Sequence, residues 1–284
     1  MTADHSHEHD RGLSHDLPTL LSRRRALSVF GGAGLVAALA ACAPDATNTA
    51  DTTSDPSDAP TTGSTDSGSG NNASTSTDEI PEETAGPYPG DGSNGVNVLT
   101  ESGIVRSDLT KSFGSASGVA EGVPLTIKLK VLNVNNGTSA ALAGAAVYLW
   151  HCDREGRYSL YSDGVTEENY LRGVQESDAD GNVTFTSIYP AAYSGRWPHI
   201  HFEVYESLQA ATTASSKLRT SQLALPEDVS AQVYATEGYE QSVRNLEQTS
   251  LDSDMVFSDG YSLQLAAVNG DVTSGYTATL NVPV

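Results

Sequence analysis

The sequence predicts an all-β protein, a β-sandwich of two packed sheets with long loops and few short helices. Short runs alternate apolar and polar residues, turn-forming residues separate these runs, and few stretches carry a helical period. Residues 125–134, LTIKLKVLNV, alternate in this way and precede the turn residues Asn135, Asn136 and Gly137. We find no internal repeat, heptad, phosphate-binding loop or nucleophile elbow in the chain.

The other expected strands alternate or are mostly apolar, and they cover residues 144–152, 183–188, 199–205, 217–225, 263–268 and 276–284. A turn at 178–182, DADGN, precedes the second of them. Asn269, Gly270 and Asp271 are expected to separate the last two. Residues 226–228, PED, predict a short helix that ends near Ala235.

Residues 1–41 have the features of an export signal. Residues 22–27, SRRRAL, resemble a twin-arginine signal, and the apolar run 26–41 is too short for a confident membrane span. Residues 39–42, LAAC, look like a lipobox, so we expect a lipid on Cys42. The alternative is a plain signal peptide cut at an Ala-x-Ala-like site. On either interpretation the protein is a bacterial one that works outside the cytoplasm, and a lipid at Cys42 would be its only membrane attachment.

Residues 42–83 are rich in Ser, Thr, Asp and Gly and nearly lack large apolar residues, so we expect a flexible tether there. The folded domain is expected to span residues 84–284. If Cys42 carries a lipid, Cys152 cannot form an internal disulfide, and we interpret it as a packed core thiol. The formal net charge of −21 argues against nucleic-acid binding, which needs a basic surface.

The most informative stretch is 188–205, IYPAAYSGRWPHIHFEVY. Residues two apart on a strand point to the same face, so His199 and His201 can reach one metal ion while Ile200 faces the other side. Tyr193 and Arg196 lie just upstream, in a loop with Pro and Gly, and suggest an anionic ligand and a cation beside the pair. Two ordinary histidines remain the alternative for an isolated pair.

A second stretch, 147–161 or VYLWHCDREGRYSLY, places Tyr158 at the end of a Gly-Arg-Tyr turn. Together these segments resemble the intradiol ring-cleavage dioxygenases, non-haem iron(III) enzymes that open catechols. The resemblance extends from Thr84 to about Asp228. It rests on TAGPYPG, GAAVYLWHCDREGRYS, the D-A-D-G-x-V-x-F turn and strand, IYPAAYSGRWPHIHFEV and TSQLALPED. The G-R-Y, P-x-x-Y and R-x-x-H-I-H elements are highly specific in combination.

The resemblance implies Fe(3+) bound by two tyrosinates and two histidines, which match Tyr158, Tyr193, His199 and His201. Arg196 matches an active-site arginine. Residues matching the pocket of the family are Gly86, Pro87, Tyr88 and Gln222. The loop of the family is usually P-G-x-Y, whereas residues 190–193 read PAAY, so the loop shape is in question.

The implied reaction cleaves a small aromatic diol with O2, between its two hydroxylated carbons, to a cis,cis-muconate-type diacid. Phenolate oxygen is a hard donor suited to iron(III). By analogy with the family, Tyr193 leaves the metal as the substrate loses its protons, and Arg196 stabilises the carbanion-like ring. Arg196 could instead form a salt bridge or stack on Trp197. A homodimer is one candidate assembly, although the long N-terminal helical dimerisation segment of some members has no counterpart here.

Two alternatives remain open at this stage. His151, His199 and His201 could form a three-histidine zinc site for hydrolytic chemistry. The chain could also be a surface binding lipoprotein without chemistry. The sequence does not name the catechol.

Overall fold

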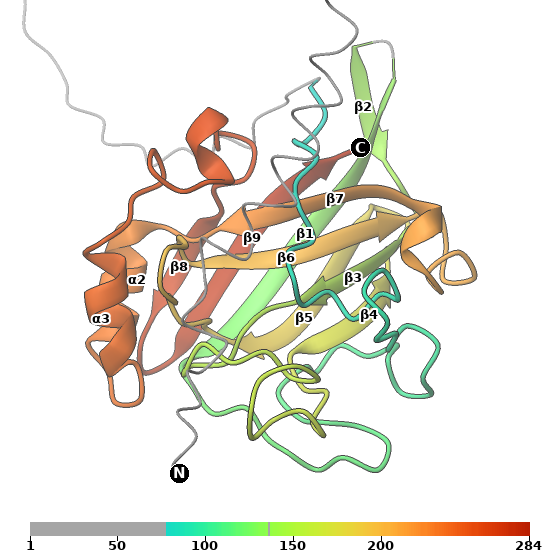
Figure 1. The fold of residues 1–284 in the computed structure, drawn as a ribbon. Coiled ribbons are helices and arrows are strands. Elements are labelled where there is room, and N and C mark those ends of the chain that lie inside the picture. Colours follow the sequence, from blue (N-terminus) through green and yellow to red (C-terminus); the bar gives the residue numbers. More distant parts are fainter. Residues whose placement is uncertain (1–77, 136) are drawn as a thin grey trace, which may run out of the picture.

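The structure is a computed structural model that describes residues 78–135 and 137–284, and it shows a sandwich of two β-sheets (Figure 1). The first sheet has the order β2-β1-β9-β8, and β5 pairs with residues 124–130 of β1 whereas β2 pairs with residues 132–135. The second sheet has the order β4-β3-β6-β7. All neighbours are antiparallel except β1 and β9. The predicted all-β sandwich is confirmed.

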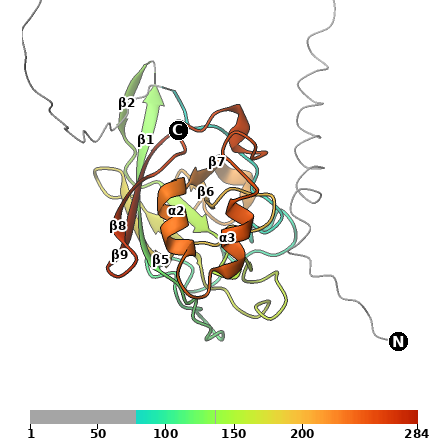
Figure 2. The ribbon, with the colours of Figure 1, turned by 90° about the vertical axis from the view of Figure 1, so that its left-hand side faces the viewer.

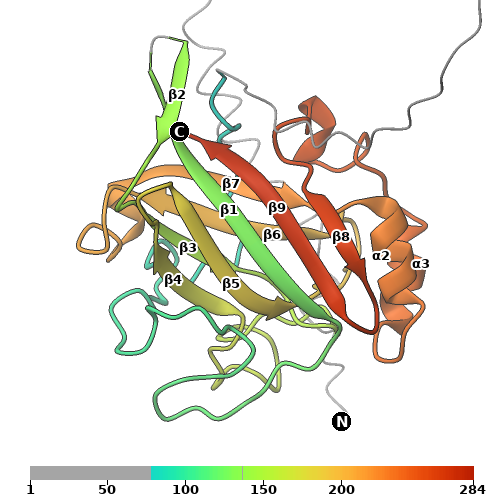
Figure 3. The ribbon, with the colours of Figure 1, turned by 180° about the vertical axis from the view of Figure 1, so that it is seen from behind.

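The strands run over the following residues: β1 Pro124–Asn135, β2 Thr138–Ala141, β3 Ala146–Trp150, β4 Arg172–Glu176, β5 Asn182–Ile188, β6 His199–Tyr205, β7 Lys217–Ala224, β8 Ala267–Asp271 and β9 Gly275–Pro283. The helices are α2 Glu227–Tyr234 and α3 Glu240–Leu246, with short 3-10 turns at η2 Ala214–Ser216 and η3 Phe257–Asp259. Figures 2 and 3 show α2 and α3 side by side at one end of the sandwich.

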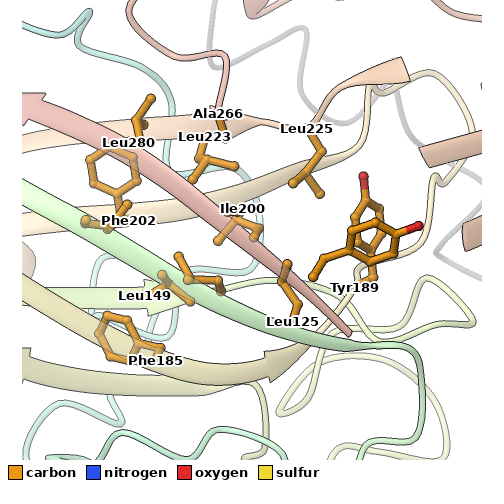
Figure 4. Packing of buried hydrophobic residues seen from close by; sticks show 14 of the residues in the cluster. Leu125, Leu149, Phe185, Tyr189, Ile200, Phe202, Leu223, Leu225, Ala266 and Leu280 are labelled. Atoms are coloured by element: carbon orange, nitrogen blue, oxygen red, sulfur yellow. The ribbon is translucent and has the colours of Figure 1, made fainter. Parts of the chain in front are cut away.

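The main core lies between the two sheets, where the inward-facing side chains meet (Figure 4). On β1 every second residue from Leu125 to Val131 is buried, as the alternation predicts, and Leu125 and Ile127 are at most 1% exposed. Leu149 of β3 and Ile200 and Phe202 of β6 face them from the second sheet. Burial of such side chains stabilises the fold by roughly 1.5–3 kcal/mol each.

Strand β6 is buried on both faces, and this arrangement positions the site. Its outer face, with His199 and His201, is covered by the segment that begins at residue 78 and by the loop between β3 and β4. Figure 1 shows the first of these segments running across β7 and β6. A second apolar cluster lies under this cover and contains Trp150, Cys152 and Tyr158. Cys152 is a buried free thiol, as predicted.

The folded domain begins earlier than the sequence analysis placed it. Ile80, which we assigned to the tether, is fully buried in the main core, and its N–H donates to the carbonyl of Pro283 at 2.8 Å. Glu83 is 7% exposed, and its N–H donates to the carbonyl of Thr220. A single apolar residue in a polar stretch was too weak a signal to move the boundary.

Three elements escaped the sequence analysis: β2, β4 and α3. Strand β2 is short and exposed along its whole length, so burial leaves no pattern in it. The last hairpin is also shifted. Residues 269–271, expected to form the turn, belong to β8, and the turn follows Asp271, whose Oδ1 accepts the N–H groups of Thr273 and Ser274. Pairing with β9 therefore extends the strand through residues with low β propensity.

The predicted export signal, the lipobox at Cys42, the four early histidines (His5, His7, His9, His15) and most of the tether lie outside the described residues. Within the described part of the chain, no helix has the length and apolar character needed to span a membrane.

Candidate metal centre

The structure brings together four side-chain donor atoms from three separate segments. The Oη atoms of Tyr158 and Tyr193 are 3.5 Å apart, and Tyr193 Oη is 3.1 Å from Nε2 of His199. His199 Nε2 is in turn 3.1 Å from Nε2 of His201. Tyr158, His199 and His201 are each 2% exposed, and Tyr193 is half-buried. The arrangement is a small cluster of oxygen and nitrogen donors that face one another.

A backbone contact fixes the orientation of His199. Its Nδ1 lies 2.5 Å from the carbonyl oxygen of Trp197, which can only accept a hydrogen bond. The proton of the neutral ring therefore sits on Nδ1, and the lone pair of Nε2 points into the cluster. A carbonyl that fixes the tautomer in this way is a usual partner of a metal-binding histidine.

Ring stacking orients His201. Its imidazole lies on the indole of Trp150, with ring centroids 4.9 Å apart and an angle of 5° between the planes. Trp150 and His201 are direct partners across β3 and β6, so the strand register sets this contact. His201 Nδ1 is buried and has no hydrogen-bond partner among residues 78–284 as described. Stacking thus replaces the hydrogen bond that usually orients such a ring.

Two loops deliver the tyrosines. The N–H of Tyr158 donates to Oγ of Ser162 at 2.9 Å, which fixes the turn after β3. Two residues of α3 hold the loop before β6 at Ala192. The N–H of Ala192 donates to Oγ of Ser242, and the carbonyl of Ala192 accepts from Nδ2 of Asn245 at 2.8 Å. Ala191 is not among the residues with positive φ, so alanine fits where the family pattern has glycine. The altered P-x-x-Y loop still presents Tyr193 to the cluster.

Arg196 is buried beside the cluster and is paired with a residue that the sequence analysis missed. Its Nε donates to Oδ2 of Asp254 at 2.9 Å, and its Nη2 donates to Oε1 of Gln222 at 2.7 Å. Asp254 is 1% exposed and also accepts the N–H of Trp197 at 2.7 Å. The salt-bridge alternative for Arg196 is therefore present in the structure. No signal in the Ser- and Asp-rich stretch 250–259 distinguishes Asp254 from its neighbours.

The predicted pocket residues take different places around the cluster. A Cβ on Gly86 would lie 3.3 Å from Cε1 of His201, so the backbone passes directly over this ring. The ring of Tyr88 lies 5.0 Å from that of Tyr158. The carbonyl of Pro87 accepts a hydrogen bond from Nδ2 of Asn94 at 2.7 Å. Gln222 of β7 is the strand partner of His201 of β6. Its Nε2 donates a hydrogen bond to the carbonyl of Thr84 at 2.9 Å.

Burial sets the ionisation of the cluster. It lowers the pKa values of His199 and His201 well below 6.5, and the charge of Arg196 adds to this effect, so both imidazoles are neutral. Burial and the neighbouring Tyr193 raise the pKa of Tyr158 well above 10. Two phenols this close cannot both ionise alone, whereas a bound cation reverses the preference.

Known proteins share this fold and part of the sequence. Residues 101–228 match the family model described as Dioxygenase. A chlorocatechol 1,2-dioxygenase of Rhodococcus opacus is 31% identical over 61 residues, which are 22% of this chain and 24% of that protein. An intradiol ring-cleavage dioxygenase from Tetranychus urticae has the same fold, with a TM-score of 0.55, 23% identity, and coverage of 72% of this chain and 94% of its own.

The matched part of the chain, less than half of its length, is similar to the intradiol ring-cleavage dioxygenases. The family match ends at residue 228, so α3, which holds the Tyr193 loop, and Asp254, which holds Arg196, both lie beyond it. The match to the curated relative covers about a quarter of that relative's length.

The three-histidine alternative does not agree with the geometry. Both ring nitrogens of His151 have protein partners: Nδ1 lies 2.7 Å from the carbonyl of Cys152, and Nε2 lies 2.7 Å from Oγ of Ser187. Both ring nitrogens of His151 are therefore engaged, and neither offers a lone pair to the cluster of Tyr158, Tyr193, His199 and His201. No group of three His, Cys, Asp or Glu side chains that could hold a metal occurs in the part of the chain that the structure describes.

Proposed function

We propose that this protein is a non-haem iron(III) dioxygenase that cleaves a catechol-type ring between its two hydroxylated carbons and forms a cis,cis-muconate-type diacid. The observation that supports this most directly is the convergence of the Tyr158, Tyr193, His199 and His201 donor atoms, each 3.1–3.5 Å from the next. Two phenolates and two neutral imidazoles suit a hard trivalent ion better than a softer divalent one.

These residues fit the proposed ion because their neighbours direct the Nε2 atoms of both histidines toward the two tyrosine oxygens. His199 offers Nε2 because its Nδ1 proton is held by the backbone, and His201 is held by Trp150. When bound there, iron(III) would take both oxygens of the diol and withdraw electron density from the ring, so that a ring carbon can react with O2.

The chain's own groups would handle protons and charge. Tyr193 is the more exposed of the two tyrosines, so its Oη is the better placed to accept a proton from the incoming diol. Tyr158 is buried and fixed by Ser162, so it stays in place. The Arg196 guanidinium, held by Asp254 and Gln222, provides a fixed positive group beside the developing negative charge of the ring.

The test is the visible spectrum of the full chain after iron loading, before and after catechol is added under argon. We expect a broad tyrosinate-to-iron(III) band that shifts to the red when catechol binds. Tyr193→Phe should change this band. Tyr276→Phe is the control, because Tyr276 lies in the main core and its hydroxyl bonds Gln232 of α2 instead of a member of the cluster. Isotopically labelled O2 should then place both oxygen atoms in the diacid.

A protein that stays colourless after iron loading would reject the dioxygenase proposal. Zinc binding, or ligand binding without turnover, would then be examined in its place.

We also propose that the protein is exported and held at the membrane by a lipid on Cys42, on the grounds of the twin-arginine-like and lipobox-like residues. Cys42→Ala should move the protein from the membrane fraction to the soluble fraction of the producing bacterium. An unchanged distribution would reject the lipid anchor.

A further inference from the structure

Two buried arginines lie near the cluster, and both are committed to protein partners. Arg172 is 1% exposed, and its five N–H groups donate to neutral oxygens of Tyr88, Pro89, Tyr148 and Ser159. Arg196 gives its Nε edge to Asp254. A substrate carboxylate is usually held by such an arginine edge in a two-bond fork. Arg172 offers no such edge here, and in Arg196 the Nε edge is occupied.

The surroundings of Arg196 are acidic. Asp254 is 0% exposed at its side chain and forms the ion pair directly. Glu83 is 7% exposed, and its charge interacts with those of Arg196, Asp254 and Asp259. Gln264 Nε2 donates a hydrogen bond to Oε1 of Glu83 at 3.3 Å. The carboxylate of Asp254 thus neutralises the positive charge of Arg196. The carboxylate of Glu83 adds a second negative charge nearby when it is ionised.

We propose that Asp254 is a positioning and specificity-determining residue that fixes Arg196 and cancels its charge, so that the site selects catechols whose ring carries no anionic substituent. This inference rests on the proposed function. An added ring carboxylate would enter a buried site with no net positive charge around Arg196 and would lose its hydration without a paired partner. A neutral diol avoids that cost.

Asp254 suits this role because it is both a hydrogen-bond acceptor for the backbone and an anion beside Arg196. As a hydrogen-bond acceptor, it takes the N–H groups of Trp197, Val256 and Phe257, which ties the 251–259 loop to the loop before β6. As an anion, it neutralises Arg196. Asp254→Asn keeps the side-chain size and removes the charge, and its single oxygen can accept either from Trp197 or from Val256 and Phe257.

The experiment measures anaerobic binding of catechol and of 3,4-dihydroxybenzoate to the iron-loaded full chain, by titration of the visible band and by calorimetry. We expect the wild type to prefer catechol. In Asp254→Asn, the affinity ratio of the carboxylated diol to catechol should rise about tenfold, a typical effect of a buried interfacial charge. A change in packing alone would weaken both ligands together. An unchanged ratio in a folded variant, or a wild type that prefers the carboxylated diol, would overturn the inference.

Glu83→Gln provides a second route if Asp254→Asn does not fold. The pKa of Glu83 is raised to about 7, so its charge appears between pH 6 and pH 8, where the ligand carboxylate is ionised throughout. The wild-type preference for catechol should strengthen over this range, and the preference of Glu83→Gln should strengthen less. Equal pH dependence in the two proteins would also overturn the inference. If the folded, iron-loaded wild type binds neither diol, the proposed function itself fails, and the inference fails with it.

Discussion

His151 and His201 are both buried histidines, yet the neighbours of their ring nitrogens differ. His151 has a protein partner on each nitrogen, whereas His201 directs Nε2 at His199 and is held by stacking on Trp150. The residue type gives no indication of this difference. The contacts of each nitrogen decide whether the ring can act as a ligand.

These contacts predict opposite results for two matched substitutions. His201→Asn should abolish stoichiometric iron binding, because a donor of the cluster is lost. His151→Asn should keep the iron and lower stability by about 1–3 kcal/mol, because buried partners lose their hydrogen bonds. Metal content after dialysis, together with urea unfolding, checks both. Loss of iron from folded His151→Asn would support the three-histidine site instead.

Glu83 predicts a pH effect on stability. Burial raises its pKa from 4.5 to about 7, so between these values the folded state binds more protons than the unfolded state. The free energy of unfolding therefore falls as the pH rises through this window, and it stays lower above pH 7. Glu83→Gln removes the effect.

We expect Glu83→Gln to be more stable than the wild type at pH 8, by an amount on the order of 2 kcal/mol, and nearly equal to it at pH 4. Urea unfolding at the two pH values makes the comparison. A variant that is less stable at both values by the same amount would show that the fit of the new amide group matters more than the charge.

At the scale of elements, the two faces of β6 have different roles, because successive side chains of a strand point to opposite faces. Ile200 and Phe202 face the core between the sheets, whereas His199 and His201 face the cover formed by loops. The strand had the predicted bounds because alternating side chains at β spacing are a local property. Its histidine face is buried because the segment around Gly86 and the loop between β3 and β4 cover it.

Gly86→Ala and its control Gly95→Ala test whether the segment around Gly86 lies against His201. Both glycines have positive φ, +71° and +103°, so each substitution should cost about 1 kcal/mol of backbone strain. At Gly86 the new Cβ would lie 3.3 Å from Cε1 of His201. A Cβ added at Gly95 would meet no other part of the described structure within 4 Å. Gly86→Ala should therefore also change the visible spectrum and weaken catechol binding. Equal spectra for the two variants would contradict the close approach.

At the scale of the whole molecule, residues 78–83 join the two sheets. The N–H of Ile80 bonds Pro283 of β9 in the first sheet, and that of Glu83 bonds Thr220 of β7 in the second. Ile80 fills the main core between them. This short segment therefore belongs to the sandwich, although its composition resembles that of the stretch before it.

A chain that begins at Asp78 should be more stable than one that begins at Thr84. The difference should be about 2–5 kcal/mol, the usual cost of deleting a buried isoleucine side chain. Urea unfolding of the two chains measures it, and Ile80→Ala in the longer chain is the control that isolates the side chain. Equal midpoints for all three would place the domain boundary at residue 84 after all.

The sequence by itself determined what depends on local order: the alternating strands β1, β5 and β6, the start of α2, and the placing of His199 and His201 on one face of a strand. The specific G-R-Y, P-x-x-Y and R-x-x-H-I-H elements added Tyr158, Tyr193 and Arg196 through resemblance. Only the tertiary structure decided which groups surround them. Asp254, Trp150 and Glu83 reach the site from segments distant in sequence, and their roles depend on burial and pairing, which no local pattern records. The same physical reason explains the domain boundary, because Ile80 is part of the core through contacts made some two hundred residues along the chain.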